Sequence, residues 1–280
     1  LRQAMLDNAL VGIALVGDRV IRSGNARMVE MFGYPDLQSL QGLPAREIYA
    51  DDAEFQTIGA DIYAAMARGE SVTREVHMRR RDGSLFWCEL TGQAVTGQPG
   101  VDSVWVGQDI SERRAAQERL RWQARHDALT SLPNRYALDE WLPQRLQAAQ
   151  AQGATVALGL LDLDDFKAIN DDWGHAVGDE VLVQVARQLG ARLEPDDLLA
   201  RIGGDEFVLV LHSAGGAQAI ARRIEALGAL LPLSVPLPGG KTHPLRLSMG
   251  LALFPQDGPD PDTLLRHADV ALHTVTLHKI

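Results

Sequence analysis

The chain has 280 residues, of which 46% are hydrophobic and 23% charged, the composition of a soluble globular protein with about two domains. The formal charge of −10 excludes the broad basic surface that DNA or RNA binding requires, and no apolar run reaches the ~20 residues of a membrane span. Cys88 is the only cysteine, so no internal disulfide can form, and we expect a reducing, cytoplasmic compartment.

The chain begins at Leu1 without a leader, which indicates a piece of a longer protein. Short strand-like runs then alternate with turns, beginning with two apolar stretches around a Gly-Asp turn in residues 12–25. Residues 71–95 predict a hairpin around the Arg-Asp-Gly turn at 81–83. Between the two hairpins, one helical face carries four apolar residues: Phe55, Ile58, Ile62 and Met66.

A charged helix is expected next, over residues 111–126, with Ser111 as its N-cap. Ala116, Leu120 and Ala124 recur at four-residue spacing and form a thin apolar stripe. Such a helix is weak alone, but two copies can pair as a short coiled coil. We therefore expect a homodimer that forms through residues 111–126.

From residue 127 on, helices and strands alternate in the order β-α-α-β-β-α-β-α, which predicts a second domain over 127–280 of the α+β or α/β class. The strands are expected in four apolar runs: 155–164, 198–202, 207–211 and 245–254. Helices are expected where apolar residues recur with helical period: 138–149, after Asp162, 181–193, 217–230 and 264–275.

Acidic residues at the strand ends predict a cation site. The apolar run that begins at residue 155 reaches Asp162, and the turn Gly203-Gly204 precedes Asp205 and Glu206. Three carboxylates at one sheet edge would repel one another unless cations lay among them. Magnesium fits, because it prefers oxygen ligands and takes its remaining ligands from water and substrate phosphates, and two such ions can clamp a phosphoryl transfer. The glycines permit positive φ and close approach of a ligand, although an ordinary surface turn also uses Gly and Asp.

Several stretches of the second half resemble, in order, the GGDEF family of diguanylate cyclases. They are HDALTSLPNR (126–135), LDLDDFKAINDDWGHAVGDEVL (161–182), ARIGGDEFVLVL (200–211), LSMGLALFPQDG (247–258) and LLRHADVAL (264–272). The resemblance implies a palm-like sheet flanked by helices, as in nucleotidyl transferases. It also implies that two GTP molecules are joined into cyclic di-GMP, with release of two pyrophosphates and with Mg²⁺ or Mn²⁺, two ions per site.

The resemblance further implies which residues bind the metal. Asp162, Asp205 and the backbone carbonyl of Leu163 would be metal ligands, and Glu206 would be a further metal ligand or catalytic acid. Asp205 is the candidate base for the ribose 3′-hydroxyl. Lys167 would stabilise the charge on the phosphates, with the backbone N–H groups near Asp165 and Phe166 and the turn at Gly203 and Gly204 beside it.

Asn170 and Asp179 would read the guanine edge, and His175 would belong to the same substrate loop. A carboxylate accepts hydrogen bonds from the ring N–H and the exocyclic amine of guanine, which adenine does not offer as a pair. Each residue also has an ordinary explanation: Asp179 could cap a helix, Asn170-Asp171 could form a turn, and Lys167 and His175 could be solvated. Their joint occurrence at the family's spacing favours the substrate role.

The sequence departs from the family pattern at two places. The family's inhibitory product site reads Arg-x-x-Asp; here Asp197 is present, Glu194 replaces the arginine, and Arg192 is out of register. Because a glutamate would repel the product phosphate, we expect this site to be absent. Thr276 and Ile280 stand where the family has a lysine and an arginine that contact the triphosphate, and Lys279 could replace one of them.

Residues 1–110 resemble a PAS sensor domain. The stretches are DNALVGIALV (7–16), NARMVEMFGY (25–34), RRDGSLFWCEL (80–90) and VGQDISERR (106–114). The resemblance implies an antiparallel five-stranded sheet with helices that cup a ligand. Cys88 shares a strand face with Phe86 and Leu90, which indicates a core residue instead of a flavin-reactive cysteine. His77 lies on the polar side of its strand, which disfavours haem; an apolar small molecule, or no ligand, stays open.

Together these patterns predict a diguanylate cyclase in which a PAS rearrangement shifts the paired 111–126 helices and brings two GTP-bound domains face to face. One alternative is a GGDEF domain that binds GTP without turnover and regulates a partner, favoured by Thr276 and Ile280. Another is the front part of a longer chain that ends in a phosphodiesterase.

Overall fold

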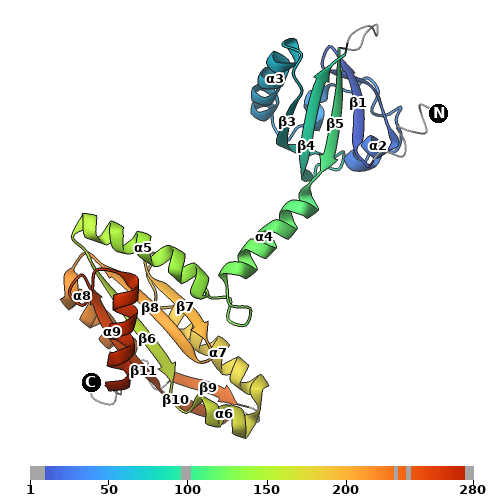
Figure 1. The fold of residues 1–280 in the computed structure, drawn as a ribbon. Helices are drawn as coiled ribbons and strands as arrows, with labels where there is room; N and C mark the ends of the chain where they lie inside the picture. Colours follow the sequence, from blue (N-terminus) through green and yellow to red (C-terminus); the bar gives the residue numbers. More distant parts are fainter. Residues whose placement is uncertain (1–9, 96–101, 230–232, 238–240, 275–280) are drawn as a thin grey trace. The chain divides into compact units, whose positions relative to one another are not determined.

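The structure is a computed structural model that describes residues 10–95, 102–229, 233–237 and 241–274 (Figure 1). The chain divides into two compact units, Leu1–Arg119 and Leu120–Ile280. Helix α4 (Ser111–Arg125) carries the chain from the first unit into the second. Within the described residues, no helix has the length and apolar character that crossing a membrane requires.

The first unit is built on one antiparallel sheet of five strands in the order β2-β1-β5-β4-β3. Its strands are β1 (Gly12–Gly17), β2 (Val20–Gly24), β3 (Val72–Arg79), β4 (Leu85–Ala94) and β5 (Ser103–Asp109). Its helices are α2 (Ala26–Phe32), the short 3₁₀ helix η1 (Ala45–Ile48) and α3 (Asp52–Ala67). The two hairpins expected from the sequence are β1–β2 and β3–β4.

The core of this unit lies between one face of the sheet and the helices. In β4, the alternating residues Phe86, Cys88 and Leu90 are buried, as their strand period predicts. Phe55 and Ile62 of α3 are also buried, whereas the side chains of Ile58 and Met66 lie outside the described residues.

The second unit has a four-stranded sheet in the order β11-β6-β8-β7. Its strands are β6 (Thr155–Leu163), β7 (Leu198–Gly203), β8 (Glu206–Ser213) and β11 (Leu247–Phe254). Its helices are α5 (Arg135–Gln152), α6 (Phe166–Trp173), α7 (His175–Gly190), α8 (Gly216–Gly228) and α9 (Pro261–Thr274). All three strand pairs are antiparallel, so of the two fold classes that the sequence predicted, this unit belongs to α+β.

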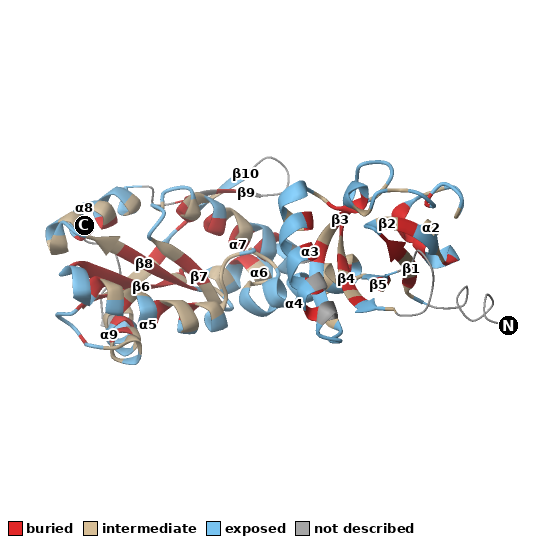
Figure 2. Ribbon diagram, turned by 90° about the horizontal axis from the view of Figure 1, so that it is seen from above, coloured by how far each residue is buried: buried red, intermediate tan, exposed pale blue. Residues whose placement is uncertain are grey.

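Strand β6 separates two hydrophobic cores, which explains why its sequence is an almost unbroken apolar run. Leu161 and Leu163 face the core shared with α7 and α8, whereas Leu158 and Leu160 face the core shared with α5 and α9. Figure 2 shows buried residues along β6 and β8, with exposed residues on the outer sides of the helices. The strand that ends in the acidic residues is therefore held from both faces.

The structure differs from the sequence prediction in one hairpin and at the end of one helix. A second hairpin, β9 (Leu233–Leu237) with β10 (Lys241–Leu245), was not predicted, because Pro236 and Pro244 interrupt its strands. Helix α7 ends at Gly190, so Leu193, expected on the helix, lies beyond it. The expected end of the last helix at Val275 falls outside the described residues.

Candidate functional site

The candidate site lies at the sheet edge where β6 ends and β8 begins. Asp162 is paired with Glu206 in the β6–β8 ladder and with Ser248 in the β6–β11 ladder. Asp205 precedes Glu206 at the tip of the β7–β8 hairpin. The antiparallel pairing thus brings together acids that are far apart in sequence, because β8 starts at the edge where β6 ends.

The acids at this edge repel one another. Burial, and then the charges of Asp205, Glu206 and Asp164, raise the pKa of Asp162 above its ordinary value. The hydroxyl of Ser248 donates to Oδ1 of Asp164 at 2.7 Å, which holds that side chain on β11. The edge is therefore a place where a cation would relieve the repulsion among carboxylates.

This set of oxygen donors fits a hard cation that takes some of its ligands from the protein and the rest from water and a substrate. Among the residues that the structure describes, no three His, Cys, Asp or Glu side chains are close enough to enclose a metal ion by themselves. Asp162, Asp205 and the carbonyl of Leu163 offer oxygen ligands only, the type that Mg²⁺ prefers, and Mg²⁺ commonly completes its shell with water and phosphate oxygens. The site is open and needs other ligands.

The hairpin tip is shaped by its two glycines. Gly203 has φ of 155° and Gly204 has φ of 49°, conformations that side chains disfavour, and the ladder register shifts between Arg201 and Gly203. A Cβ built on either glycine meets no atom within 4 Å. The space beside both glycines is therefore open, which lets a ligand approach the backbone of the tip.

Arg201 connects this tip to the turn that follows α4, a link that sequence reasoning missed. Its Nε and Nη2 donate to the carbonyl oxygen of Gly204 at 3.0 and 2.7 Å, and its Nη1 donates to Oδ1 of Asp127 at 2.9 Å. Asp127 also accepts hydrogen bonds from the backbone N–H and the hydroxyl of Thr130. Burial raises the pKa of Asp127, but the bonds from Thr130 and Arg201 outweigh it and leave the pKa below its ordinary value.

Helix α6 begins directly after the acidic edge. Asp165 adopts φ of 58°, and no side chain caps the helix that starts at Phe166. The first backbone N–H groups of the helix thus have no capping side chain, and Lys167 is exposed in the same turn. Since α6 starts three residues after β6 ends, the partial positive charge of the helix start lies near the end of that strand.

Asn170 and Asp179 lie on neighbouring helices, separated in sequence by Gly174 with φ of 84°. Asn170 belongs to α6, which excludes the turn explanation. Helix α7 begins at His175, so Asp179 lies beyond its first turn, exposed, and does not cap it. The carboxylate and the amide remain available to a ligand.

Asp197, the acid at the position of the family's product-inhibition motif, has a structural role. The side chain of Asp197 is completely buried, and it forms an ion pair with Arg223 of α8. It also accepts backbone N–H bonds from Glu194 at 2.7 Å and His212 at 3.1 Å. Arg223 lies 3.6 Å from the exposed Glu194 carboxylate, so its charge is already engaged. Thr276, Lys279 and Ile280, which bear on triphosphate binding, lie outside the described residues.

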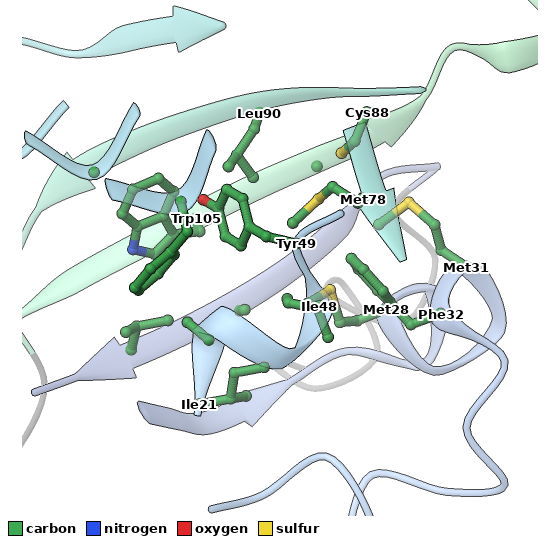
Figure 3. Close-up of a pocket in the computed structure, with 16 residues that line it drawn as sticks. Ile21, Met28, Met31, Phe32, Ile48, Tyr49, Met78, Cys88, Leu90 and Trp105 are labelled. Carbon is green, nitrogen blue, oxygen red and sulfur yellow. The ribbon is translucent and has the colours of Figure 1, made fainter. Parts of the chain in front are cut away.

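The first unit contains a small apolar cavity (Figure 3). Its volume is about 40 Å³. A cavity of this volume has room for a few heavy atoms and is far too small for a haem or a flavin. Sulfur atoms contribute to its wall, from Met28, Met31, Met78 and Cys88. Burial raises the pKa of Cys88 to about 12, so the thiol stays protonated. His77 is not among the lining residues and packs on Trp87 instead, with ring centroids 3.7 Å apart.

The start of α4 is bound to the sheet of the first unit. Ser111 was expected to cap this helix, but its hydroxyl accepts a hydrogen bond from the Trp87 N–H. Its own N–H donates to Asp109, whose carboxylate pairs with Arg80 at 2.6 Å. The cap prediction was wrong, because Ser111 is the first residue of the helix and the carbonyl of Ile110 accepts the first helical hydrogen bond, from the Arg114 N–H at 2.9 Å.

One helical turn on, two arginines extend this attachment. Arg114 lies over the Trp87 ring at 3.8 Å and pairs with Glu75 at 2.8 Å. Arg113 pairs with Glu89 at 3.2 Å. A shift of strands β3 and β4 would therefore act directly on the first turns of α4.

Comparison with known proteins places both units. Residues 124–279 match the family model described as diguanylate cyclase, GGDEF domain, and residues 10–112 match a PAS domain model. Over 155 residues the chain is 41% identical to the diguanylate cyclase TpbB of Pseudomonas aeruginosa, covering 55% of this chain and 35% of TpbB. Over 249 residues it is 38% identical to the cyclic di-GMP phosphodiesterase PdeR of Escherichia coli K12, covering 81% of this chain and 37% of PdeR. The chain thus spans 35–37% of the length of these two relatives.

A solved structure agrees with this match. The coiled coil and GGDEF domain of DgcB from Caulobacter crescentus, in complex with c-di-GMP, is 30% identical. It aligns with a TM-score of 0.52, covering 59% of this chain and 87% of that chain.

Proposed function

Because the chain belongs to the GGDEF family and carries a PAS domain ahead of its GGDEF domain, we propose that it is a diguanylate cyclase that condenses two GTP molecules into cyclic di-GMP and two pyrophosphates. The observation that carries the proposal is the pairing of Asp162 with Glu206, next to Asp205, at one sheet edge. This is the arrangement of acids that a metal-dependent nucleotidyl transfer requires.

The residues at the edge have distinct roles in this proposal. Asp162, Asp205 and the Leu163 carbonyl would hold Mg²⁺ or Mn²⁺, two ions per site, with Glu206 as a further ligand or acid. When bound, these ions supply positive charge to the phosphates of GTP. Asp205, at the tip of the hairpin, accepts the proton of the attacking 3′-hydroxyl as a general base.

In the proposal, the phosphates lie at the start of α6 and the base lies one helical turn further on, beside α7. The uncapped helix start at Phe166 and the Lys167 ammonium bind the phosphates. Asn170 and Asp179, with His175 beside them, bind guanine, whose ring N–H and exocyclic amine match a carboxylate. Adenine presents no such pair of donors, so the site selects GTP.

The reaction needs two domains, because one product contains two phosphodiester bonds and each domain binds one GTP. Helix α4 supports a homodimer, since none of its residues is buried and Leu120 is 65% exposed. Ala116, Leu120 and Ala124 form its apolar stripe, which a second copy would cover. A change in the PAS sheet then reaches α4 through Arg113 and Arg114 and alters the pairing. The protein acts in the cytoplasm, where GTP is available.

Incubation of the full chain with GTP and Mg²⁺, followed by chromatography, tests the activity. We expect cyclic di-GMP and pyrophosphate from the wild type, and none from Asp205→Asn. Asp139→Asn, on an exposed carboxylate of α5, is the matched control and should keep full activity. GTP binding without product in the wild type would instead identify a GTP-binding regulatory domain, the alternative that Thr276 and Ile280 favour.

A further inference from the structure

Helices α6 and α7 meet at Gly178, which is buried one position before Asp179. A Cβ built on Gly178 would lie 2.9 Å from Cγ of Asn170 and 3.2 Å from Cζ of Phe166, and it would overlap Oδ1 of Asn170. The carboxamide of Asn170 therefore occupies the volume that any side chain at position 178 would need.

The backbone does not explain this glycine. Gly178 lies inside α7 and does not have the positive φ that Gly174, at the start of the helix, adopts. A glycine in a helix interior is less favourable than alanine by about 1 kcal/mol, because it loses more conformational freedom on folding. The close approach of Asn170, with the Phe166 ring beside it, accounts for a glycine at this position.

We propose that Gly178 is a positioning residue for base recognition: its missing side chain seats the Asn170 carboxamide beside Asp179, so that both contact the guanine of GTP. This inference rests on the proposed function. Any side chain at position 178 would displace the amide while the carboxylates at the sheet edge, on β6 and β8, stay in place. A substitution of Gly178 should therefore weaken the selection of guanine and leave the binding of the phosphates unchanged.

Steady-state kinetics of the full chain with GTP and with ATP test the proposal, using Gly178→Ala, Asn170→Ala and the double variant. We expect Gly178→Ala to raise KM for GTP and to lower the preference for GTP over ATP by about tenfold, the effect of one lost hydrogen bond, with a smaller change in kcat. The double variant should match Asn170→Ala, because both changes remove the same contact.

Gly190→Ala is the matched control, because it lies at the end of the same helix and a Cβ there meets no atom within 4 Å. The inference would be overturned if Gly178→Ala and Gly190→Ala had the same preference for GTP over ATP, or if the double variant had a clearly lower preference than Asn170→Ala. Turnover of GTP by the wild type would still support the cyclase in either case. If the wild type forms no product, calorimetric binding of GTP and ATP to the same variants gives the same comparison.

Thermal unfolding separates a local displacement from misfolding. If Gly178→Ala melts well below the wild type, Asn170→Ser in that background should restore the melting temperature, because serine leaves the space free. It should not restore the preference for GTP. Failure of Asn170→Ser to restore stability would show that the clash does not involve Asn170.

Discussion

Replacement of Arg201 by alanine should destabilise the GGDEF unit strongly. The change removes the ion pair with Asp127 and both hydrogen bonds to the Gly204 carbonyl. The side chains of Arg201 and Asp127 are only 12% and 23% exposed, so Asp127 would keep a poorly solvated charge. Removing one partner of a buried pair costs about 3–5 kcal/mol, and the residual exposure points to the lower end, about 3 kcal/mol.

Urea denaturation and calorimetry of the full chain measure this loss. A unit of this size loses roughly 2–4 °C in Tm for each kcal/mol, so its transition should fall by about 6–12 °C. Cyclase activity should fall as well, because Gly204 adjoins Asp205 at the hairpin tip.

Arg135→Ala is the control for this prediction. Its carboxylate partner, Asp139, lies 4.0 Å away, and both side chains are more than half exposed, so the expected change is within about 0.5 kcal/mol. If Arg201→Ala were no less stable than this control, the link between the α4 turn and the hairpin tip would not contribute to the stability of the unit.

Three further predictions concern other residues. Cys88, with a pKa raised to about 12, should resist alkylation at pH 8 in the folded chain and react after denaturation, as a thiol assay measures. The pKa of Asp109 is raised by burial but lowered further by bonds from Arg80 and Ser111, so it is depressed overall. Its contribution to stability is therefore present above the unfolded pKa of about 3.9 and is lost as pH falls through the folded value; melting curves of wild type and Asp109→Asn should converge below about pH 4. Cyclic di-GMP at low micromolar concentration should not inhibit turnover, because Glu194 and the engaged Asp197 leave no product site there; an inhibition curve in that range would contradict this.

Local patterns predicted most of the elements, because each depends on residues close in sequence. The apolar run of β6 indicated a buried strand, and the glycine turn at 81–83 indicated the β3–β4 hairpin. The hairpin β9–β10 escaped prediction because Pro236 and Pro244 oppose strand formation, a cost that a two-stranded ribbon tolerates.

The contacts that position the site were not visible in the sequence, because they join distant segments. Asp127 and Arg201 each stood in a recognisable stretch, yet no spacing rule states that they meet across the fold. Gly178 lay outside the helix predicted over 181–193, and nothing in the sequence singled it out before the place of the Asn170 amide was known. Asp197 fitted a binding motif by position, but its complete burial against Arg223 gives it a structural role.

Helix α4 has a thermodynamic consequence for signalling. None of its residues is buried within the chain, so this segment of 15 residues gains little stability from the burial of apolar side chains. Isolated helices near this length are marginal in water. Its first turn is held to the sheet of the first unit by Arg114, which lies over the Trp87 ring. Its other end leads into the turn at Asp127, which Arg201 binds. Loosening either anchor would let the segment fray, so a change in one unit can reach the other as a loss of helical order in α4.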